Sequence, residues 1–182
     1  EKGIETSKRV IKEGISIASM SMTGIFFHFA GYTLSYLGHP EEGLEFSKEA
    51  RSIGIELNNP LITYASSASI AKGFIMNNML AEAIKVIEEA IDISKKYIIM
   101  VGLDFLYNEY LEALFILKEK DKFEQGFIYL ESLKNFLINS KWYQVIYYKN
   151  KGILEIFKSE LKDAEESLNK VYNLSKDFLI EN

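Results

Sequence analysis

A unit of roughly forty residues recurs along this chain, and the repeat limits the possible folds more than any other feature. Gly43 and Ala83, which are 40 residues apart, each precede a bulky apolar residue, and each is followed seven places later by an alanine, Ala50 or Ala90. The first small position recurs at Gly3, Gly43, Ala83, Gly126 and Ala164. Small side chains let antiparallel helices approach closely, and a unit of about 40 residues holds two helices of about 15 to 18 residues with two turns. The chain is therefore predicted to be all-α and built from helical hairpins.

The predicted organisation is one domain over 1–182, with a leading helix followed by four hairpins. The leading helix falls within 1–20, at about 2–18. The paired helices are expected at 22–37 with 40–57, 60–76 with 79–96, 101–118 with 121–138, and 141–158 with 160–178, which gives repeats at 21–58, 59–97, 98–139 and 140–182. Pro40 and Pro60 suit the first position of a helix. Because the chain begins already in helical periodicity, we expect it to be a piece of a longer protein.

The small positions and their neighbours resemble tetratricopeptide (TPR) repeats. The residues that carry the resemblance are Gly31, Gly38, Gly43 and Ala50, echoed by Ala71, Ala83 and Ala90. The TPR unit is usually 34 residues, and the longer helices here are similar to variants in signal-transduction ATPases and transcription activators. The resemblance implies a right-handed superhelix of antiparallel hairpins with about nine helices. The third repeat departs most, since Leu114 and Leu133 stand at small positions, and its packing is expected to be distorted.

Composition and charge narrow the function. The chain has no cysteine, so it has no thiolate nucleophile and no cysteine zinc site. This fits a reducing compartment, and we expect a cytoplasmic protein. The formal net charge of −5 argues against binding of duplex nucleic acid, which needs a basic surface.

The stretch 14–40 has no charged residue and is long enough to span a bilayer. Seven polar side chains interrupt it: Ser16, Ser19, Ser21, Thr23, His28, Thr33 and Ser35. Polar groups are costly in hydrocarbon, and the repeat passes through this stretch. We therefore expect two packed helices and no membrane segment.

No constellation for catalysis, metal binding or cofactor binding is found. The two histidines, His28 and His39, lack the neighbours of known metal motifs. His28 is expected to pack in the core or the groove, and the protein is expected not to be an enzyme. The aromatic cluster Trp142, Tyr143, Tyr147 and Tyr148 is expected to pack between helices, because a base-stacking platform would need a more basic groove.

Charge is concentrated on the second helix of each pair and is sparse on the first. In TPR superhelices the first helices line the concave face, so the resemblance implies a nearly neutral groove. The groove positions of the family fall here on Ile25, His28, Tyr32 and Ser35; Ala65, Ala68 and Lys72; Asn108, Leu111 and Phe115; and Ile146, Lys149 and Ile153. We expect Ile25, His28, Tyr32, Lys72, Asn108, Leu111, Phe115 and Lys149 to form a peptide-binding groove.

Three functions are compatible with this sequence. The first is a non-catalytic scaffold for a protein or peptide, acting as a regulatory or sensor module in a larger signalling or transcription-regulating protein. The second is a homo-oligomerisation module, in which the uncharged N-terminal helices form a symmetric homodimer interface. The third is a small-molecule binder or enzyme, for which no site is found.

Overall fold

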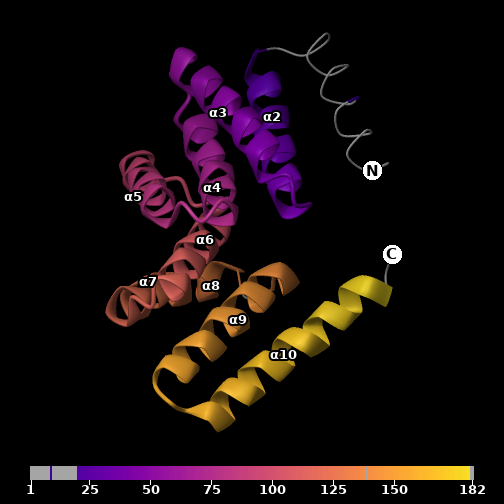
Figure 1. Ribbon diagram of the computed structural model, residues 1–182, viewed down its shortest axis with the longest axis vertical. Helices are drawn as coiled ribbons and strands as arrows, with labels where there is room; N and C mark the ends of the chain where they lie inside the picture. Colours follow the sequence, from indigo (N-terminus) through magenta and orange to yellow (C-terminus); the bar gives the residue numbers. More distant parts are fainter. Residues whose placement is uncertain (1–8, 10–19, 138, 181–182) are drawn as a thin grey trace. The chain divides into compact units, whose positions relative to one another are not determined.

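The computed structural model describes Arg9, residues 20–137 and residues 139–180, with side chains to residue 176. These residues form helices and no strand. The helices are α2 (Met20–Tyr36), α3 (Pro40–Glu56), α4 (Pro60–Met76), α5 (Leu80–Tyr97), α6 (Leu103–Ile116), α7 (Lys120–Ser132), α8 (Lys134–Leu137), α9 (Lys141–Phe157) and α10 (Leu161–Ile180) (Figure 1). The all-α prediction is confirmed for this part of the chain, whereas the leading helix predicted within 1–20 falls almost entirely outside it. The chain divides into two compact units, Glu1–Met100 and Val101–Asn182.

In the first unit, α2 and α3 form a hairpin whose backbones almost touch (Figure 1). A Cβ atom placed on Gly31 would lie 2.6 Å from the carbonyl oxygen of Gly43, and one on Gly43 would lie 2.6 Å from that of Gly31. Ser35 and Ser47 flank the crossing, and each hydroxyl donates to the glycine carbonyl four residues earlier. The small positions found in the sequence are therefore the contact points of the hairpin.

The second hairpin, α4 with α5, uses alanines at the same positions. Ala71 and Ala83 are both fully buried. Pro60 occupies the first turn of α4, and the Asn59 side chain caps that helix by accepting hydrogen bonds from the backbone of Leu61 (3.1 Å) and Ile62 (3.2 Å). A cap at the start and small residues at the crossing thus define the start and the middle of the helix.

Most of the turns between helices share one conformation. A residue with positive φ follows the helix end at Gly38, Asn58, Asn78, Ile98, Lys118 and Ser159. The next backbone N–H donates to a carbonyl five residues earlier, as in His39 N to Leu34 O at 2.9 Å and Glu119 N to Leu114 O at 2.9 Å. This is the Schellman arrangement, in which left-handed backbone closes the helix and reverses the chain.

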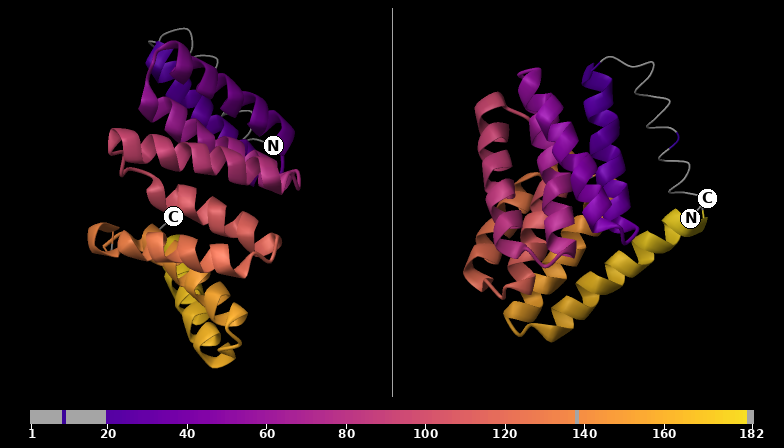
Figure 2. Two further views of the ribbon diagram at one scale, coloured as in Figure 1. Left: turned by 90° about the vertical axis from the view of Figure 1, so that its left-hand side faces the viewer. Right: turned by 45° about the horizontal axis from the view of Figure 1, so that its top comes forward.

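In the second unit, α6 packs beside α7, and α9 beside α10 (Figure 2). The helix predicted over 121–138 is not continuous, because α7 ends at Ser132 and the short α8 begins at Lys134. The break falls on Leu133, which is buried and occupies the position that Ala50 and Ala90 hold in the first unit. The break therefore falls in the third repeat, at one of the two small positions that hold a leucine, whereas α6 continues through the other, Leu114.

Within the described residues, no helix combines the length and the apolar character needed to cross a bilayer. The helix α2, which holds most of the uncharged stretch, packs on both α3 and α4. The membrane reading of this stretch therefore has no support among these residues.

Candidate partner-binding faces

One face of α2 presents a row of three rings. His28, Tyr32 and Tyr36 are four residues apart, so they lie one above the other on the helix. The ring centroids of His28 and Tyr32 are 6.4 Å apart, and those of Tyr32 and Tyr36 are 4.9 Å apart. The two tyrosine hydroxyls lie 3.2 Å from each other. The sequence predicted His28 and Tyr32 at this face, and Tyr36 continues the row.

His28 is fixed to α4 by the side chain of Ser69. Nδ1 of His28 lies 2.5 Å from Oγ of Ser69, and that hydroxyl is also 3.1 Å from the carbonyl oxygen of His28. When the hydroxyl donates to the carbonyl, Nδ1–H of the neutral imidazole donates to Oγ. Burial lowers the pKa of His28 from 6.5 to about 4, so the ring is uncharged at neutral pH. His28 therefore joins the two helices without adding charge to the face.

Lys72 of α4 lies under the same row. The residue is only 4% exposed, and its Nζ lies 4.4 Å from the centroid of the Tyr36 ring. An ammonium group at this distance from a ring face makes a cation–π contact. The Tyr36 ring thus stands over the ammonium group, and the outer surface at this point is aromatic.

The remaining predicted residues of the first unit differ in exposure. Ile25, one turn before His28, is 36% exposed and lies on the same side of α2. Ser35 and Ala68 are buried, and Ala65 is half-buried. We call His28, Tyr32, Tyr36 and Lys72 the α2–α4 face. Sequence reasoning missed Tyr36 and Ser69, although Tyr36 is one turn beyond Tyr32 and Ser69 is one turn before Lys72.

In the second unit, two of the predicted groove residues lie in the interior. Asn108 is buried in a polar network, in which its Oδ1 accepts from Nδ2 of Asn150 (3.3 Å) and its Nδ2 donates to Oε1 of Glu109 (3.3 Å). Leu111 is fully buried, and its Cδ2 atom is 3.1 Å from the place where Gly126 would carry a Cβ. These two side chains support the packing of α6 with α7 and α9.

Phe115 and Lys149 are the predicted residues that reach the surface of this unit. Phe115 is 41% exposed and packs edge-on against Phe157, with centroids 5.8 Å apart. Lys149 lies 3.9 Å from the Glu112 carboxylate, which offsets its charge. Ile146 is buried and Ile153 is half-buried. In the first unit the projected register therefore brings His28, Tyr32 and Lys72 together, although Ser35 and Ala68 are buried. In the second unit it divides between core and surface.

In the aromatic cluster of α9, Tyr143 and Tyr147 are buried between helices, as the sequence predicted, whereas Trp142 is 47% exposed. Tyr143 is fully buried, and its hydroxyl donates to the carbonyl of Leu130 at 2.9 Å. Tyr147 donates to a Glu131 carboxylate oxygen at 3.0 Å. Burial raises the pKa of Tyr143 to about 12, and it also raises that of Tyr147. Trp142, at the start of the helix, stacks on Phe105.

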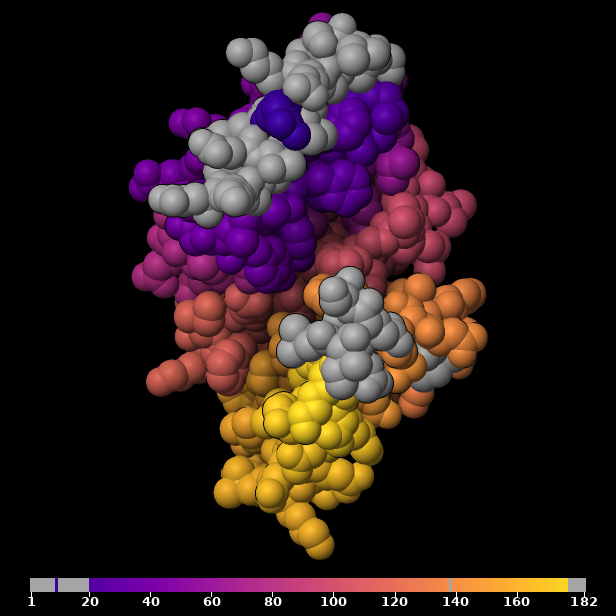
Figure 3. Space-filling view, turned by 90° about the vertical axis from the view of Figure 1, so that its right-hand side faces the viewer, coloured from indigo at the N-terminus to yellow at the C-terminus, as the bar shows by residue number. Residues whose placement is uncertain are grey.

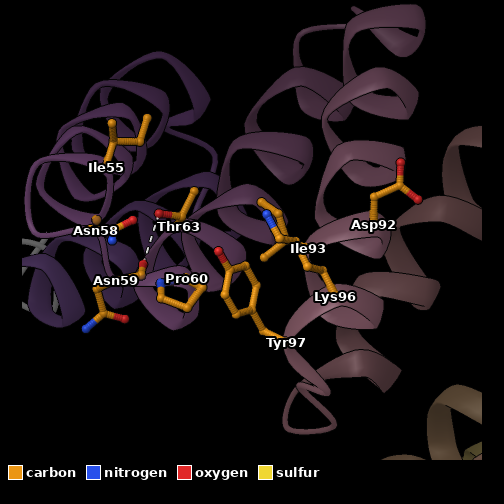
Figure 4. Close-up of a pocket in the computed structure, with 10 residues that line it drawn as sticks. Ile55, Asn58, Asn59, Pro60, Thr63, Asp92, Ile93, Lys96 and Tyr97 are labelled. Atoms are coloured by element: carbon orange, nitrogen blue, oxygen red, sulfur yellow. Dashed lines mark hydrogen bonds between the residues drawn. The ribbon is translucent and has the colours of Figure 1, made fainter.

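A surface pocket of about 360 Å³ lies elsewhere in the first unit, between the α3–α4 turn and the last turns of α5 (Figure 4). Pro60, Ile93 and Tyr97 form an apolar part of its lining, whereas Asp92 and Lys96 contribute charge. None of the residues predicted from the repeat lines it. Its open, mixed character suits a single side chain better than an enclosed ligand.

Among residues 20–137 and 139–176, the side chains of His, Asp and Glu form no cluster of three that could hold a metal ion. The ionisable groups of the α2–α4 face are a neutral imidazole, two phenols and a covered ammonium group. What this arrangement offers is an aromatic surface with hydrogen-bonding tips, which is suited to binding.

Comparison with solved structures agrees with this architecture. The chain is similar to a crystal structure of nearly identical TPR-like repeats ascribed to a kinesin light chain of Podosopora anserina, with a TM-score of 0.56 and 13% sequence identity over 97% of this chain and 87% of that one. A second crystal structure of those repeats, with one substitution, gives a TM-score of 0.58 at 13% identity over 98% and 87%. No protein-family model and no curated protein matches the sequence. The chain therefore has the fold of a TPR-like helical-repeat protein, as the small positions predicted.

Proposed function

We propose that this chain is a non-catalytic scaffold that binds a protein or peptide partner on the α2–α4 face. TPR-like repeats generally serve as protein-interaction scaffolds, and we place this one in a regulatory or sensor module of a larger signalling or transcription-regulating protein. The observation that carries the proposal is the row of His28, Tyr32 and Tyr36 at one-turn spacing. Aromatic side chains with polar tips are enriched where proteins bind one another.

The chemistry of the face indicates the kind of partner. Tyr36 is 50% exposed, and Ile25 adds apolar surface at the other end of the row. His28 is neutral at physiological pH, and Lys72 lies beneath a ring. A helix or extended segment that places apolar or aromatic side chains over these rings would bury surface with little loss of charge hydration. In the second unit, Phe115 and the paired Lys149 offer a similar mixture of aromatic surface and balanced charge.

Peptide selection tests the proposal directly. Random peptides are displayed and selected against the complete chain, and the dissociation constants of the selected peptides are measured for the wild type and for Tyr32→Ala and Tyr36→Ala. Since buried aromatic anchors often contribute about 2 kcal/mol, each substitution is expected to weaken binding by at least tenfold. Tyr172→Ala is the matched control, because Tyr172 is a 60% exposed tyrosine on α10.

Two outcomes would overturn the proposal. In one, the selected peptides bind the Tyr32 and Tyr36 variants as tightly as the wild type. In the other, light scattering shows a stable dimer that Tyr36→Ala converts to monomer, and the face then serves self-association. Retention of the wild-type melting temperature by both variants would show that any loss of binding arises at the face.

A further inference from the structure

The pocket between the α3–α4 turn and the last turns of α5 is formed by residues that the α2–α4 face does not use. Pro60 and Thr63 lie on one side of it, and Ile93 and Tyr97 lie on the other (Figure 4). Part of the surface of α2, in indigo, is seen in Figure 3, but α2 contributes no residue to the lining of the pocket. Lys72 lies more than three helical turns after Pro60 on α4, a distance of about 18 Å. The pocket and the α2–α4 face are therefore separate surfaces of the first unit.

One wall of the pocket is held in place by close contact between α3 and α4. A Cβ atom on Gly54 would lie 2.7 Å from the backbone nitrogen of Thr63, so the end of α3 lies directly against the start of α4. Asn58 turns the chain between the two helices with a φ of 48°, and the side chain of Asn59 caps α4. The Thr63 hydroxyl donates to the Asn59 carbonyl at 3.0 Å. This wall is therefore preformed, as is usual for binding sites.

Exposed apolar side chains gather around the pocket. In its lining, Ile55 is 63% exposed and Tyr97 is 48% exposed. Ile98, which follows Tyr97, is 83% exposed and has a φ of 55°, a backbone conformation that β-branched residues seldom adopt. Apolar side chains that cluster at a hollow in the surface mark an interaction site. The pocket volume of about 360 Å³ is at the lower end of the range for binding sites, so it is suited to one bulky side chain.

The two outer helices that border the pocket are acidic. Together, α3 and α5 carry nine acidic and five basic side chains, whereas α2 and α4 carry one lysine and no acid. Arg51 of α3 pairs with Glu89 of α5 at 2.7 Å, one turn before the pocket, so the charge of this arginine is offset. Glu56, which follows Ile55, is exposed to solvent. The charge around the pocket therefore favours a partner that carries basic side chains.

The two charged residues of the lining have different surroundings. Asp92 is exposed to solvent, whereas Nζ of Lys96 lies 5.2 Å from the centroid of the Tyr97 ring. We propose that the pocket takes a leucine or phenylalanine side chain from a partner segment that carries an arginine or lysine beside it. The apolar side chain contacts Pro60, Ile93 and Tyr97, and the basic side chain pairs with Asp92. This site goes beyond the α2–α4 face, because it gives the scaffold a second surface and a partner of different chemistry.

Blocked dipeptides test the proposal on the complete chain. The probes are Ac-Phe-Arg-NH2, Ac-Phe-Glu-NH2 and Ac-Ala-Arg-NH2, and nuclear magnetic resonance follows the signals of Ile93 and Tyr97 during each titration. Ac-Phe-Arg-NH2 should shift both signals to saturation. It should bind about threefold more tightly than Ac-Phe-Glu-NH2, which is the effect expected of one solvent-exposed ion pair. Ac-Ala-Arg-NH2 should give no saturable shift, because it lacks the side chain that fills the pocket.

Substitutions in the lining separate the apolar contact from the charge. Tyr97→Ala should weaken the binding of Ac-Phe-Arg-NH2 at least about fivefold, as expected for the loss of an aromatic contact. Tyr172→Ala is the matched control, since Tyr172 is a 60% exposed tyrosine outside the lining. Asp92→Asn should weaken the binding of the same probe about threefold, and Lys96→Gln should strengthen it, because the two substitutions change the charge in opposite directions.

Three results would overturn the proposal. They are the absence of a saturable shift of Ile93 and Tyr97 with any probe, equal or tighter binding of Ac-Phe-Glu-NH2, and weaker binding of Ac-Phe-Arg-NH2 by Lys96→Gln. The last two results would indicate an acidic partner or a site without charge selection. The α2–α4 face is tested by Tyr32→Ala and Tyr36→Ala, which should leave the binding of the dipeptides at the pocket unchanged. The two proposals therefore fail by different measurements.

Discussion

The two compact units are made of the same kind of helical hairpin, but they hold it together differently. In the first unit, glycine or alanine stands at each helix crossing, and the helices α2 to α5 are regular and evenly spaced. In the second unit, Leu114 and Leu133 stand at crossing positions, and the second helix of the hairpin breaks in two. Small residues thus allow the close backbone contact of the first unit. Of the two bulky residues in the second unit, Leu114 is buried within the continuous α6, and the helix break falls at Leu133.

The buried polar side chains of the two units also differ. The buried polar groups of the first unit include serines that bond to their own helix, such as Ser35, Ser47 and Ser67. The second unit buries a network between helices, formed by Asn108, Glu109 and Asn150. Serines that bond within their own helix leave the hairpin surface smooth, so backbone contact dominates in the first unit. In the second unit, specific side-chain pairs replace that contact.

Gly31→Ala should give the largest effect, because it attacks the backbone contact itself. The added methyl group would lie 2.6 Å from the Gly43 carbonyl and in direct collision with the Ser47 hydroxyl, so the two helices must separate. We expect a loss of about 3 kcal/mol in the free energy of unfolding. Urea denaturation followed by circular dichroism measures it, and hydrogen exchange should locate the loosening in α2 and α3.

Gly126→Ala in the second unit is the matched comparison. There the new methyl group would meet only the side chains of Leu111 and Tyr110, at 3.1 Å and 3.3 Å, which can shift. The gain of about 1 kcal/mol in helix propensity should offset that contact, leaving stability nearly unchanged. Equal losses in the two variants would show that close backbone contact is not what distinguishes the units.

The second prediction concerns the stability of the fold at acid pH. His28 is neutral in the folded state, with its pKa lowered from 6.5 to about 4 by burial. Its contribution to stability is therefore fully present above pH 6.5 and is lost as the pH falls from 6.5 to about 4. The loss amounts to up to about 3 kcal/mol. Urea midpoints measured across this range should fall more steeply for the wild type than for His28→Gln, which keeps a hydrogen-bond donor near Ser69.

The stability of the second unit should instead fall at high pH. Burial raises the pKa of Tyr107 and of Tyr143 from 10.0 to about 12, so the stability that they contribute is present below pH 10 and is lost as the pH rises toward 12. The single tryptophan, Trp142, lies in this unit and reports its unfolding by fluorescence. For the acid prediction, a fall in the urea midpoint that is the same in His28→Gln as in the wild type would show that His28 does not cause the acid sensitivity.

The sequence predicted the fold because its strongest signals are local and repeated. Small residues at helix crossings, Pro40 and Pro60 at helix starts, and Asn59 as a cap each act within a few residues of their own position. The break at Leu133 was predicted as a distortion and not as a place where the helix ends. How a backbone yields to a bulky side chain depends on the packing around it, which the repeat pattern does not contain.

The candidate site was predicted less completely, for a related reason. The register selected His28, Tyr32 and Lys72, which lie on one side of the neighbouring helices α2 and α4, where Gly31 and Ala71 occupy equivalent positions. In α6 the corresponding position is Leu114, and Leu111, which the same register put in the groove, lies in the core. The contacts of Ser69 with His28 and of Tyr36 with Lys72 depend on side-chain reach across helices. Such contacts leave no periodic signal in the sequence.

The smallest expected effect sharpens the comparison at the turns. Gly38, Asn58 and Asn78 suit the left-handed backbone of the first unit, with Ile98 as an exception, whereas the second unit uses Lys118 and Ser159. Lys118 has a φ of 59° and is exposed, so Lys118→Gly removes the strain of a side chain in that region without removing buried contacts. We expect a gain of about 1 kcal/mol in the free energy of unfolding, measured as a higher urea midpoint with an unchanged slope.

Asn78→Gly is the control and should change stability by only a few tenths of that amount, since asparagine already tolerates this conformation. If Lys118→Gly gives no gain, the turns of the two units are equally relaxed, and the difference between the units then lies in their helix crossings and buried polar groups.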